Sequence, residues 1–408
     1  LNQWDDTKEY KLIDVLEALI DYRGKTPKKV DSGIPLITAK IVKGGRINEP
    51  NEFLAEEDYD KWMVRGLPKP GDIVLTTEAP LGEVAQLDDR KIALAQRIVT
   101  LRGKKNVLDN TYLKYYFLSN VGQSRLKVRE TGTTVTGIKQ SELREVLVTC
   151  PPFVIQQKIA NILSSLDDKI EVNRRINEQL EELAGALFKS WFVDFEPFKD
   201  GEFVESELGM IPKGWKVGTL SEILYISKDS VNPSKMPNCI FHHYSIPAYD
   251  NGKREETQEG NTILSNKFKI DNKTTLFSKL NPRIKRVWFV DDVEDNSICS
   301  TEFIPYKAKD KDLVYFVNSV LSSDYFYNKI MSIVNGATGS HQRFHPKDTL
   351  NFIFAYNMEV AKEYNNIVKP IITKILNNQQ EITHLTTLRD TLLPKLMSGE
   401  IDVNEVKI

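Results

Sequence analysis

The chain has 408 residues, of which 40% are hydrophobic and 27% are charged, and its formal net charge is −2. This length predicts two or three domains, each able to bury a core of its own. The composition is that of an ordinary globular protein, and no apolar run approaches the roughly 18 to 20 residues that a membrane span needs. The small net charge leaves nucleic acid open as a partner, because the local distribution of charge decides that question.

The chain begins with a polar, acidic stretch, LNQWDDTKEY, in which no signal peptide is visible. Its three cysteines, Cys150, Cys239 and Cys299, show no CxxC spacing. A sparse, odd set of cysteines suits a reducing compartment. We therefore expect ordinary core thiols in a cytoplasmic protein.

Residues 1–152 predict a first globular block in which short β-runs alternate with helical stretches. The segment GDIVLTTEAP (71–80) is typical of a strand that enters a proline-bearing loop, and ALAQRIVTL (93–101) of another strand. Basic residues gather near the start of the block, opposed mainly by Asp31: Arg23, Lys25, Lys28, Lys29, Lys40, Lys43 and Arg46. Such segregated charge is typical of a surface that binds phosphates.

A long amphipathic helix is predicted from about Ile155 to Trp191. Its apolar residues recur in steps of three and four and so form one helical stripe. Pro151 and Pro152 stand just before it, where proline is tolerated. A helix of roughly 35 residues spans about 50 Å.

This helix ends in an aromatic run, ALFKSWFVDFEPF (186–198), which carries too many aromatics for a solvated linker. These side chains either cover the second block or dock a partner subunit, and the sequence leaves both alternatives open. If this region docks a partner, the candidate subunit contacts are Phe188, Trp191, Phe192 and Phe195, together with Leu393, Lys395 and Leu396 near the C-terminus.

A second block, residues 209–357, is followed by a second amphipathic helix from about Ile367 to Leu396. Pro370 is expected to start or kink this helix, and Pro394 to loosen its last turn. The order block, helix, block, helix suggests that the chain contains itself twice.

The apolar stripes of the two helices correspond at a constant shift of 205, as for Leu166 with Ile371 (371 − 166) and Leu183 with Leu388 (388 − 183). The strand-like segments of the first block recur as TTLFSKLNPR (274–283) and ICSTEFIPY (298–306). A duplicated chain tends toward pseudo-two-fold symmetry, so it can present two reading heads to one DNA duplex.

Both helical stripes are interrupted near the middle by polar residues: Asn173, Arg174 and Asn177 in the first, and Asn378, Gln379 and Gln380 in the second. Antiparallel helices would bring these positions together, and a buried polar layer fixes register at some cost in stability. We therefore predict an antiparallel intramolecular pair; the alternative is that each helix packs only on its neighbouring block.

We predict an α+β fold with two globular mixed α/β domains joined by two long antiparallel coiled-coil helices. The predicted segments are a first domain (1–152), a central helical region with its aromatic end (153–208), a second domain (209–357) and a C-terminal helical region (358–408).

Near the end of each block lies a loop rich in Gly, Thr and Ser, ETGTTVTGIKQSEL (130–143) and NGATGSHQRFHPKDTL (335–350). Small residues allow close approach to phosphate, and Gln, Arg, Asn and His offer donors and acceptors that read base edges. Gln342 and Arg343 are the strongest candidates, because Gln pairs with adenine and Arg with guanine. The alternative for any one residue is an ordinary polar surface loop.

The predicted DNA-contacting residues of the first block are Arg23, Lys25, Thr26, Lys28, Lys40, Thr76, Thr77, Glu78, Gln96, Arg97, Thr133, Thr134, Thr136 and Lys139. Those of the second block are His243, Tyr244, Ser245, Lys279, Asn281, Arg283, Lys285, Arg286, Ser340, His341, Gln342 and Arg343.

No catalytic constellation is evident. The segment CPPF resembles the [N/D]PP[Y/F] motif of amino-methyltransferases, but Cys150 cannot accept hydrogen bonds from a target amine, and no GxG loop is present for S-adenosylmethionine. The run GMIPKGW has Trp215 where a phosphate loop needs Lys. His341 and His345 have no Cys or carboxylate set beside them, so no metal site is predicted.

The sequence resembles the specificity subunit of type I restriction-modification enzymes over essentially its whole length. The most specific segments are QQKIANILSSLDDKIEVNRRINEQLEELAGALFKSWFVDFEPF (156–198) and LRDTLLPKLMSGEIDV (388–403). Recurring motifs of the two domains are DYRGKTP (21–27), GDIVLTTEAPLGEV (71–84), HYSIPAYDNG (243–252), SKLNPRIKR (278–286) and GSHQRF (339–344). One departure is that TTVTG in the first domain lacks the SHQR of the second.

The resemblance implies two target-recognition domains that each read half of a bipartite DNA site, with the helix pair as a ruler between them. It implies two modification subunits that methylate adenine N6 with S-adenosylmethionine. Restriction subunits, where they join, bring ATP and magnesium to DNA translocation and cleavage. The family's specificity subunit carries no catalytic residue and no cofactor of its own.

Two other functions remain possible from the sequence. The first is a self-contained DNA methyltransferase. It would need the two motifs that are missing, and methyl transfer by the purified chain alone would support it. A coiled-coil scaffold leaves the duplicated basic blocks unexplained, and weak binding to DNA of any sequence would favour it.

Overall fold

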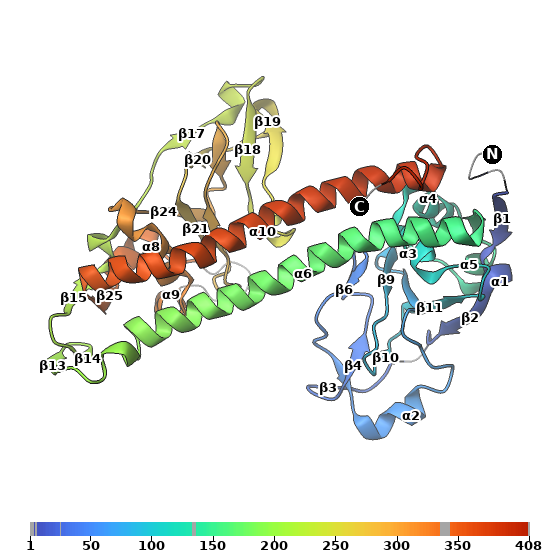
Figure 1. Cartoon of the computed structure of the whole chain (residues 1–408), viewed down its shortest axis with the longest axis horizontal. Coiled ribbons are helices and arrows are strands. Elements are labelled where there is room, and N and C mark those ends of the chain that lie inside the picture. The colour runs from blue at the N-terminus through green and yellow to red at the C-terminus, as the bar shows by residue number, and fades with distance from the viewer. Residues whose placement is uncertain (1–3, 5, 25, 133–135, 335–342, 407–408) are drawn as a thin grey trace. The chain divides into compact units, whose positions relative to one another are not determined.

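The structure, a computed structural model, describes residues 4, 6–24, 26–132, 136–334 and 343–406 (Figure 1). It divides into two compact units: unit 1 comprises Leu1–Glu171 with His384–Ile408, and unit 2 comprises Val172–Thr383. The long helices α6 (Phe153–Phe192, green in Figure 1) and α10 (Met358–Ser398, red) each contribute to both units. Every unit therefore contains one globular block and a stretch of each helix.

The main sheet of unit 1 has the strand order β2-β11-β8-β9, with every neighbouring pair antiparallel. A second sheet has the order β10-β4-β7-β3, in which β10 and β4 are parallel. The strands are β1 (Lys8–Lys11), β2 (Leu16–Asp21), β3 (Lys29–Val30), β4 (Ile34–Ile37), β5 (Val42–Lys43), β6 (Arg46–Ile47), β7 (Phe53–Leu54), β8 (Ile73–Thr77), β9 (Leu81–Gln86), β10 (Ala93–Leu94), β11 (Ile98–Gly103) and β12 (Leu147–Cys150). The helices are α1 (Leu12–Val15), α2 (Tyr59–Trp62), α3 (Asn110–Leu118), α4 (Asn120–Val128) and α5 (Gln140–Arg144).

The main sheet of unit 2 has the order β16-β24-β21-β22, again antiparallel throughout. The second sheet has the order β17-β20-β23-β18-β19, in which β18 and β23 are parallel. The strands are β13 (Phe203–Ser206), β14 (Gly209–Pro212), β15 (Lys216–Thr219), β16 (Leu224–Ile226), β17 (Ser230–Val231), β18 (Ile240–Tyr244), β19 (Glu256–Glu259), β20 (Lys267–Lys269), β21 (Thr274–Ser278), β22 (Val287–Val290), β23 (Ser297–Cys299), β24 (Phe303–Ala308) and β25 (Ile353–Tyr356). The helices are α7 (Ile246–Asp250), α8 (Val314–Ser322) and α9 (Asp324–Ile333).

The two units repeat one fold. In unit 1, Leu101 of β11 pairs with Ile73 of β8, and in unit 2, Tyr306 of β24 pairs with Thr275 of β21. These partners are shifted by 205 (306 − 101) and 202 (275 − 73) residues. The predicted α+β fold and its internal duplication are confirmed, while the predicted pseudo-two-fold symmetry stays a prediction.

Matching serine caps mark the same helix boundary in each unit. The Ser119 hydroxyl accepts a hydrogen bond from the Gly122 N–H at the start of α4, and the Ser323 hydroxyl accepts one from the Phe326 N–H at the start of α9. A short hydroxyl side chain satisfies an N–H group that the first turn of a helix leaves without a partner. Each serine therefore ends one helix and begins the next.

The helix pair is antiparallel. In unit 2, Asn173 donates to Glu381 at 2.8 Å, and Asn378 donates to the side chain of Asn177 at 2.8 Å, so residue numbers rise along α6 as they fall along α10. Asn177 and Asn378 are buried. This confirms the predicted pair and places polar residues from the middle of both helices in contact.

The start of the second helix was predicted wrongly. Helix α10 begins at Met358, about two and a half turns before Ile367 and well before Pro370, and it continues through that proline. Proline inside a helix removes one backbone hydrogen bond. Tyr364, Val368 and Ile372 are all buried in the core of unit 2, and this burial of apolar surface offsets the lost bond.

No helix within the described part of the chain is long and apolar enough to cross a membrane. Cys150 and Cys299 are buried and Cys239 is half-buried, and all three are free thiols.

Candidate DNA-recognition interface

In unit 1, the loops predicted to contact DNA converge at one end of the main sheet, where β8 ends and β11 begins. The Thr77 N–H donates to the Arg97 carbonyl at 2.9 Å, and the Ile138 N–H donates to the Thr77 carbonyl at 2.9 Å. Glu78 forms an isolated antiparallel bridge with Gly137. We call this end, residues 21–23, 77–80, 96–97 and 136–139, the first recognition edge.

Charged side chains at this edge are held in fixed positions. The Arg97 Nε lies 2.9 Å from the Glu78 carboxylate. Arg23 forms a bidentate ion pair with Asp21, with its Nη2 2.6 Å from the carboxylate, and donates through Nη1 to the Ile138 carbonyl at 2.8 Å. A guanidinium fixed by such a fork keeps its orientation at little further entropic cost when a ligand binds.

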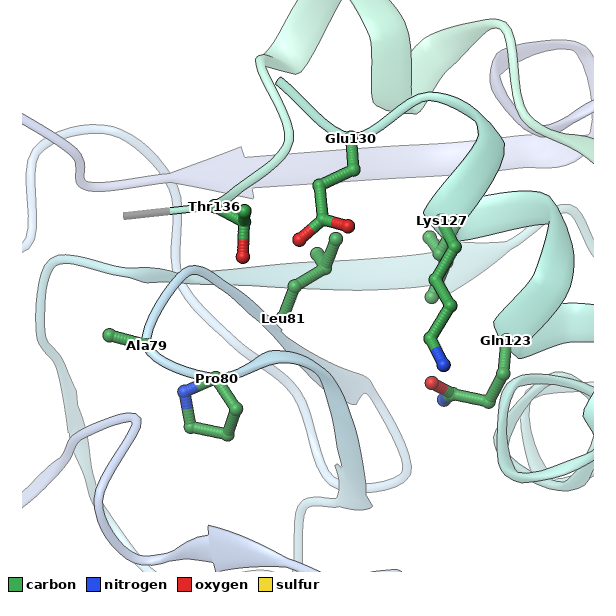
Figure 2. Close-up of a pocket in the computed structure, with 8 residues that line it drawn as sticks. Ala79, Pro80, Leu81, Gln123, Lys127, Glu130 and Thr136 are labelled. Carbon is green, nitrogen blue, oxygen red and sulfur yellow. The ribbon is translucent and has the colours of Figure 1, made fainter. Parts of the chain in front are cut away.

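Beside the first recognition edge is a pocket with mixed lining (Figure 2): Ala79, Pro80, Leu81, Gln123, Leu126, Lys127, Glu130 and Thr136. Figure 2 shows Gln123 and Lys127 extending from helix α4 toward the loop that carries Pro80. Gln123 donates to the Gly82 carbonyl at 2.8 Å and so ties this loop to the helix. Thr136, a predicted DNA contact, lies on the rim.

Unit 2 has a corresponding edge where β21 ends and β24 begins. The Lys279 N–H donates to the Glu302 carbonyl at 2.9 Å, which matches the Thr77–Arg97 bond of unit 1. The Arg343 Nη2 lies 3.0 Å from the Glu302 carboxylate, and Arg343 is exposed. We call residues 278–286, 300–302 and 343 the second recognition edge.

The loop 279–286 of this edge is basic and is tied down at several points. Tyr327 of α9 donates its hydroxyl hydrogen to the Arg283 carbonyl at 3.0 Å, and Lys285 lies 3.0 Å from Asp324. Asn281 adopts a φ of 47°, in the left-handed region, where a short polar side chain is tolerated better than most. Lys279 and Arg283 belong to the same loop, which therefore presents several cations close together.

His243, Tyr244 and Ser245 lie at the end of β18 and differ in how accessible they are. His243 is half-buried, and its Nδ1 lies 3.0 Å from Gln258. Burial lowers the pKa of His243, so the ring is neutral at pH 7. Tyr244 and Ser245 are buried, and the Ser245 hydroxyl caps helix α7 by accepting from the Ala248 N–H.

Several other predicted contacts are already engaged inside their unit. Thr76 and Thr77 are buried in β8, because all five residues of this strand face packed surroundings. Arg286 is buried and forms a bidentate ion pair with Asp250. Direct contact with DNA would require these three side chains to leave their present surroundings.

The remaining predictions of the first block fall outside its recognition edge or on its margin. Lys40 lies 3.5 Å from Glu52, which directly precedes β7 and also binds Lys29. Thr26 and Lys28 are exposed between β2 and β3, whereas Gln96 is half-buried and Lys139 is exposed at the edge itself. Six predicted contacts lie outside the described residues: Lys25, Thr133, Thr134, Ser340, His341 and Gln342.

The aromatic end of α6 covers unit 2. Phe188 and Phe192 are buried, and the Phe192 ring packs 4.8 Å from Phe316 and 5.2 Å from Tyr364, measured between centroids. Trp191 and Phe195 are half-buried against the same cluster. Of the two alternatives left open by the sequence, the structure places these side chains in the domain core, which removes Phe188 and Phe192 from the surface that a partner could reach.

The C-terminal end of α10 has the same role in unit 1. Leu396 is buried in the core of this unit and Leu393 packs against that core. Lys395 lies 3.4 Å from Glu400 and keeps part of its side chain exposed. Of the predicted subunit contacts in α10, Lys395 is thus the one whose charged group reaches solvent.

Sequence reasoning missed residues that orient the predicted contacts. Asp21 holds Arg23, and Arg65 donates to the Arg23 carbonyl at 2.7 Å. Asp21 ends β2 and Arg23 lies two residues later in the following turn, and this closeness in sequence could have revealed the pair. Arg65 reaches the first edge from a distant part of the sequence, and Glu302 binds Arg343 across 41 residues, so no local pattern marks these two contacts.

The chain is similar in sequence to a known family of proteins. Residues 5–182 match the family model described as the type I restriction modification DNA specificity domain. The chain is 31% identical to the type I restriction enzyme MjaIX specificity subunit of Methanocaldococcus jannaschii, a match that covers 91% of this chain and 88% of that one. It is 22% identical to the HindI specificity subunit of Haemophilus influenzae, over 82% of this chain and 87% of the relative.

The fold is also that of a solved structure. The type I restriction-modification S subunit from M. genitalium superposes with a TM-score of 0.57 at 17% identity, and the match covers 96% of both chains. The family model that the first part of the chain matches is that of a DNA specificity domain. The chain belongs to the family of type I restriction-modification specificity subunits, and the prediction of a non-catalytic DNA-recognition subunit is confirmed by that membership.

Proposed function

We propose that this chain reads a bipartite DNA site, one half with each recognition edge, and directs partner subunits to methylate adenine N6 there. The observation that carries the proposal is the repetition of one backbone frame with different side chains. The Thr77–Arg97 and Lys279–Glu302 bonds are equivalent, yet the second partner is basic in unit 1 and acidic in unit 2. Two equivalent readers with different side chains are what a site with two unlike halves requires.

The cations of the edges supply affinity and the fixed polar groups supply specificity. Lys279, Arg283 and Lys139 suit phosphate contacts, which add salt-dependent affinity without reading sequence. Arg23, Arg97 and Arg343 carry guanidinium groups that match the O6 and N7 acceptors of guanine. Each good bidentate contact is worth about 1 to 3 kcal/mol of discrimination between bases.

Membership of the family implies assembly with other subunits of a restriction-modification complex and with DNA. In finer detail, we propose two modification subunits, each supplying S-adenosylmethionine for methyl transfer. A restriction subunit, where it joins, would add ATP and magnesium. Lys395 and its surroundings on α10 are a proposed contact for these partners, because this basic group is exposed.

The antiparallel helices are proposed to set the distance between the half-sites. Helices α6 and α10 each contribute to both units, and their buried asparagine layer fixes their register. A helix pair of fixed register has a fixed length, so the number of unread base pairs between the half-sites would be fixed as well.

The test is co-expression with the neighbouring modification subunit in a host that lacks adenine methylation, followed by single-molecule sequencing for N6-methyladenine. We expect methylation at a two-part motif with a constant unread gap. Methylation of one continuous motif would contradict the division of reading between two units. A stable complex without any methylation would favour the scaffold alternative.

A further inference from the structure

Two turn segments connect helix α6 to the strands that leave the recognition loops. In unit 2, the segment 246–254, which we call the α7 turn, reaches the helices at one end. The Lys253 Nζ lies 3.1 Å from the Glu181 carboxylate of α6, and Gln379 of α10 donates to the Gly252 carbonyl at 2.8 Å. The side chain of Lys253 also lies over the ring of Tyr249, 5.5 Å from its centroid.

The other end of the α7 turn holds the start of β22. Asp250 accepts two hydrogen bonds from the Arg286 guanidinium, at 2.7 and 2.9 Å. The Val287 N–H points to the Tyr249 hydroxyl at 3.4 Å. Because the Ser278 N–H donates to the Arg286 carbonyl at 3.0 Å, both ends of loop 279–286 are held by the residue that Asp250 binds.

Unit 1 makes the same connection with other groups. The segment 42–47, which we call the β5–β6 turn, carries Arg46, whose Nη1 lies 3.9 Å from Glu171 of α6. The Gly44 N–H donates to the Glu83 carboxylate at 2.8 Å, and the Glu83 N–H donates to the Thr76 hydroxyl at 2.9 Å. Each link thus runs from a helix carboxylate, through a cation on a turn, to the strand beside the recognition loop.

The attachment points are equivalent in the two repeats. Glu83 and Arg286 differ by 203 (286 − 83), and their partners Thr76 and Ser278 differ by 202 (278 − 76), which matches the shift of β8 onto β21. In unit 1 this position is the acidic Glu83, which accepts a hydrogen bond from the Gly44 N–H. In unit 2 it is the basic Arg286, which donates to the Asp250 carboxylate. Opposite chemistry therefore makes the same mechanical connection twice.

We propose that the β5–β6 turn and the α7 turn are braces that fix each recognition loop relative to the spacer helix, with Arg46 and Lys253 as their positioning residues. This inference rests on the proposed function, because it assigns the braces to the reading of the half-sites. Arg286, predicted from the sequence as a DNA contact, becomes a positioning residue that acts through loop 279–286.

Physical considerations favour such a device. A reading side chain that shifts by much more than about 0.5 Å loses its directional contacts, and a surface loop held only at its strand ends moves by more than that. Burial lowers the pKa of Lys253, but Glu181 and Tyr249 together outweigh burial and leave that pKa above its usual value. The ammonium group is therefore charged at pH 7 and can hold the carboxylate.

The experiment compares two variants. Lys253→Met removes the charge but keeps an unbranched side chain of similar length, and Lys253→Arg retains the charge. Lys269→Met is the matched control, since Lys269 is exposed on β20 of the same unit. Amide hydrogen exchange of the full chain, without DNA or partners, measures peptides that cover residues 278–287. We expect exchange to rise roughly threefold to tenfold in Lys253→Met and to stay at the wild-type rate in the other two variants.

A charge swap, Glu181→Lys with Lys253→Glu, tests the pair directly and should restore slow exchange. Unchanged exchange in Lys253→Met, with the protein folded, would overturn the brace. The second readout is methylation by the co-expressed complex: Lys253→Met should modify sites whose gap differs by one base pair from the normal one. Faster exchange with an unchanged gap preference would overturn the positioning role. A wild-type complex that methylates no bipartite site would instead refute the proposed function, and the exchange data would still decide the mechanical link.

Discussion

The two recognition edges share a backbone frame and differ in nearly everything that a ligand would touch. The carbonyls of Arg97 and Glu302 accept equivalent hydrogen bonds, from Thr77 and Lys279, yet the two side chains carry opposite charges. Arg97 pairs with Glu78 of the β8–β9 loop, whereas Glu302 pairs with Arg343, which lies 41 residues further along the chain. The frame thus depends on backbone bonds, and the side chains are free to vary without loss of the fold.

The loops between the paired strands differ as well. Residues 78–80 join β8 to β9, whereas the longer, basic loop 279–286 joins β21 to β22. The longer loop is tied to α9 by Tyr327 and to the α7 turn by Arg286. A loop that carries more cations should contribute more to the salt dependence of binding, so the two halves need not contribute equally to affinity.

The largest expected effect concerns the packing of the aromatic end of α6 in the core of unit 2. Phe192→Ala should lower the free energy of unfolding of unit 2 by about 4 kcal/mol, because it opens a cavity among Phe316, Tyr364 and Trp215. Amide exchange should accelerate in α8 and stay unchanged in α3. Val193→Ala, at an exposed neighbouring position, is the control. Equal acceleration in both units would show that the two cores are not independent.

The next effect separates the two readers. Arg343→Ala should weaken reading of only the half-site that belongs to unit 2, by about 2 kcal/mol or roughly thirtyfold, and Arg97→Ala should do the same for the other half. Methylation efficiency on sites with single-base changes in either half provides the measurement. Uniform loss across all sequences would mean that these arginines contact only phosphate.

A third prediction concerns a position that is charged in unit 1 and apolar in unit 2. Asp167 accepts from Arg389 at 2.8 Å and from Tyr115 at 2.6 Å, whereas the equivalent residue 205 further on (372 − 167) is the buried Ile372. Asp167→Asn should cost unit 1 about 1.5 kcal/mol at pH 7, because charge-assisted hydrogen bonds are replaced by neutral ones.

This cost should depend on pH. Burial raises the pKa of Asp167, but Lys114, Tyr115 and Arg389 outweigh burial and hold it below the usual value of 3.8. A carboxyl whose pKa is lowered by folding adds stability above its unfolded pKa and loses it as the pH falls through the folded value. Urea unfolding should therefore show the stability difference between the wild type and Asp167→Asn begin to shrink near pH 3.8 and vanish below the folded pKa, which is lower still. A difference that persists there would assign the effect to packing.

The smallest effect tests the asparagine layer. Replacing Asn177 and Asn378 together by Leu should change the stability of unit 2 by no more than about 1 kcal/mol in either direction, because a buried polar pair is exchanged for an apolar one. The double variant should tolerate more than one gap length in methylation assays, since the apolar layer no longer fixes register. A single, unchanged gap would show that the rest of the helix seam is sufficient.

Much of the fold could be predicted from the sequence, because its main features are periodic. Steps of three and four residues define both helices, and a constant shift reveals the duplication. The start of α10 escaped prediction because the low helix propensity of Pro370 predicts that a helix starts or kinks there. In the structure, burial of Tyr364 and Val368 in the core of unit 2 stabilises the turns that precede the proline.

The recognition edges were predictable only in part. Glycine, threonine and basic residues mark the loops, but the partner of Arg286 lies 36 residues away, at Asp250. Thr76 and Thr77, predicted as DNA contacts, are buried because they belong to a strand that is covered on both faces. Long-range pairing of this kind leaves no local signal in a single sequence.

The most direct test of the account changes the length of the helix pair. Insertion of four residues, about one turn, into the middle of both α6 and α10 adds about 6 Å at 1.5 Å per residue. With a rise of 3.4 Å per base pair, the unread gap should lengthen by about one to two base pairs while both half-site sequences stay the same. An active complex with an unchanged gap would contradict the central claim that two equivalent readers are spaced by these helices.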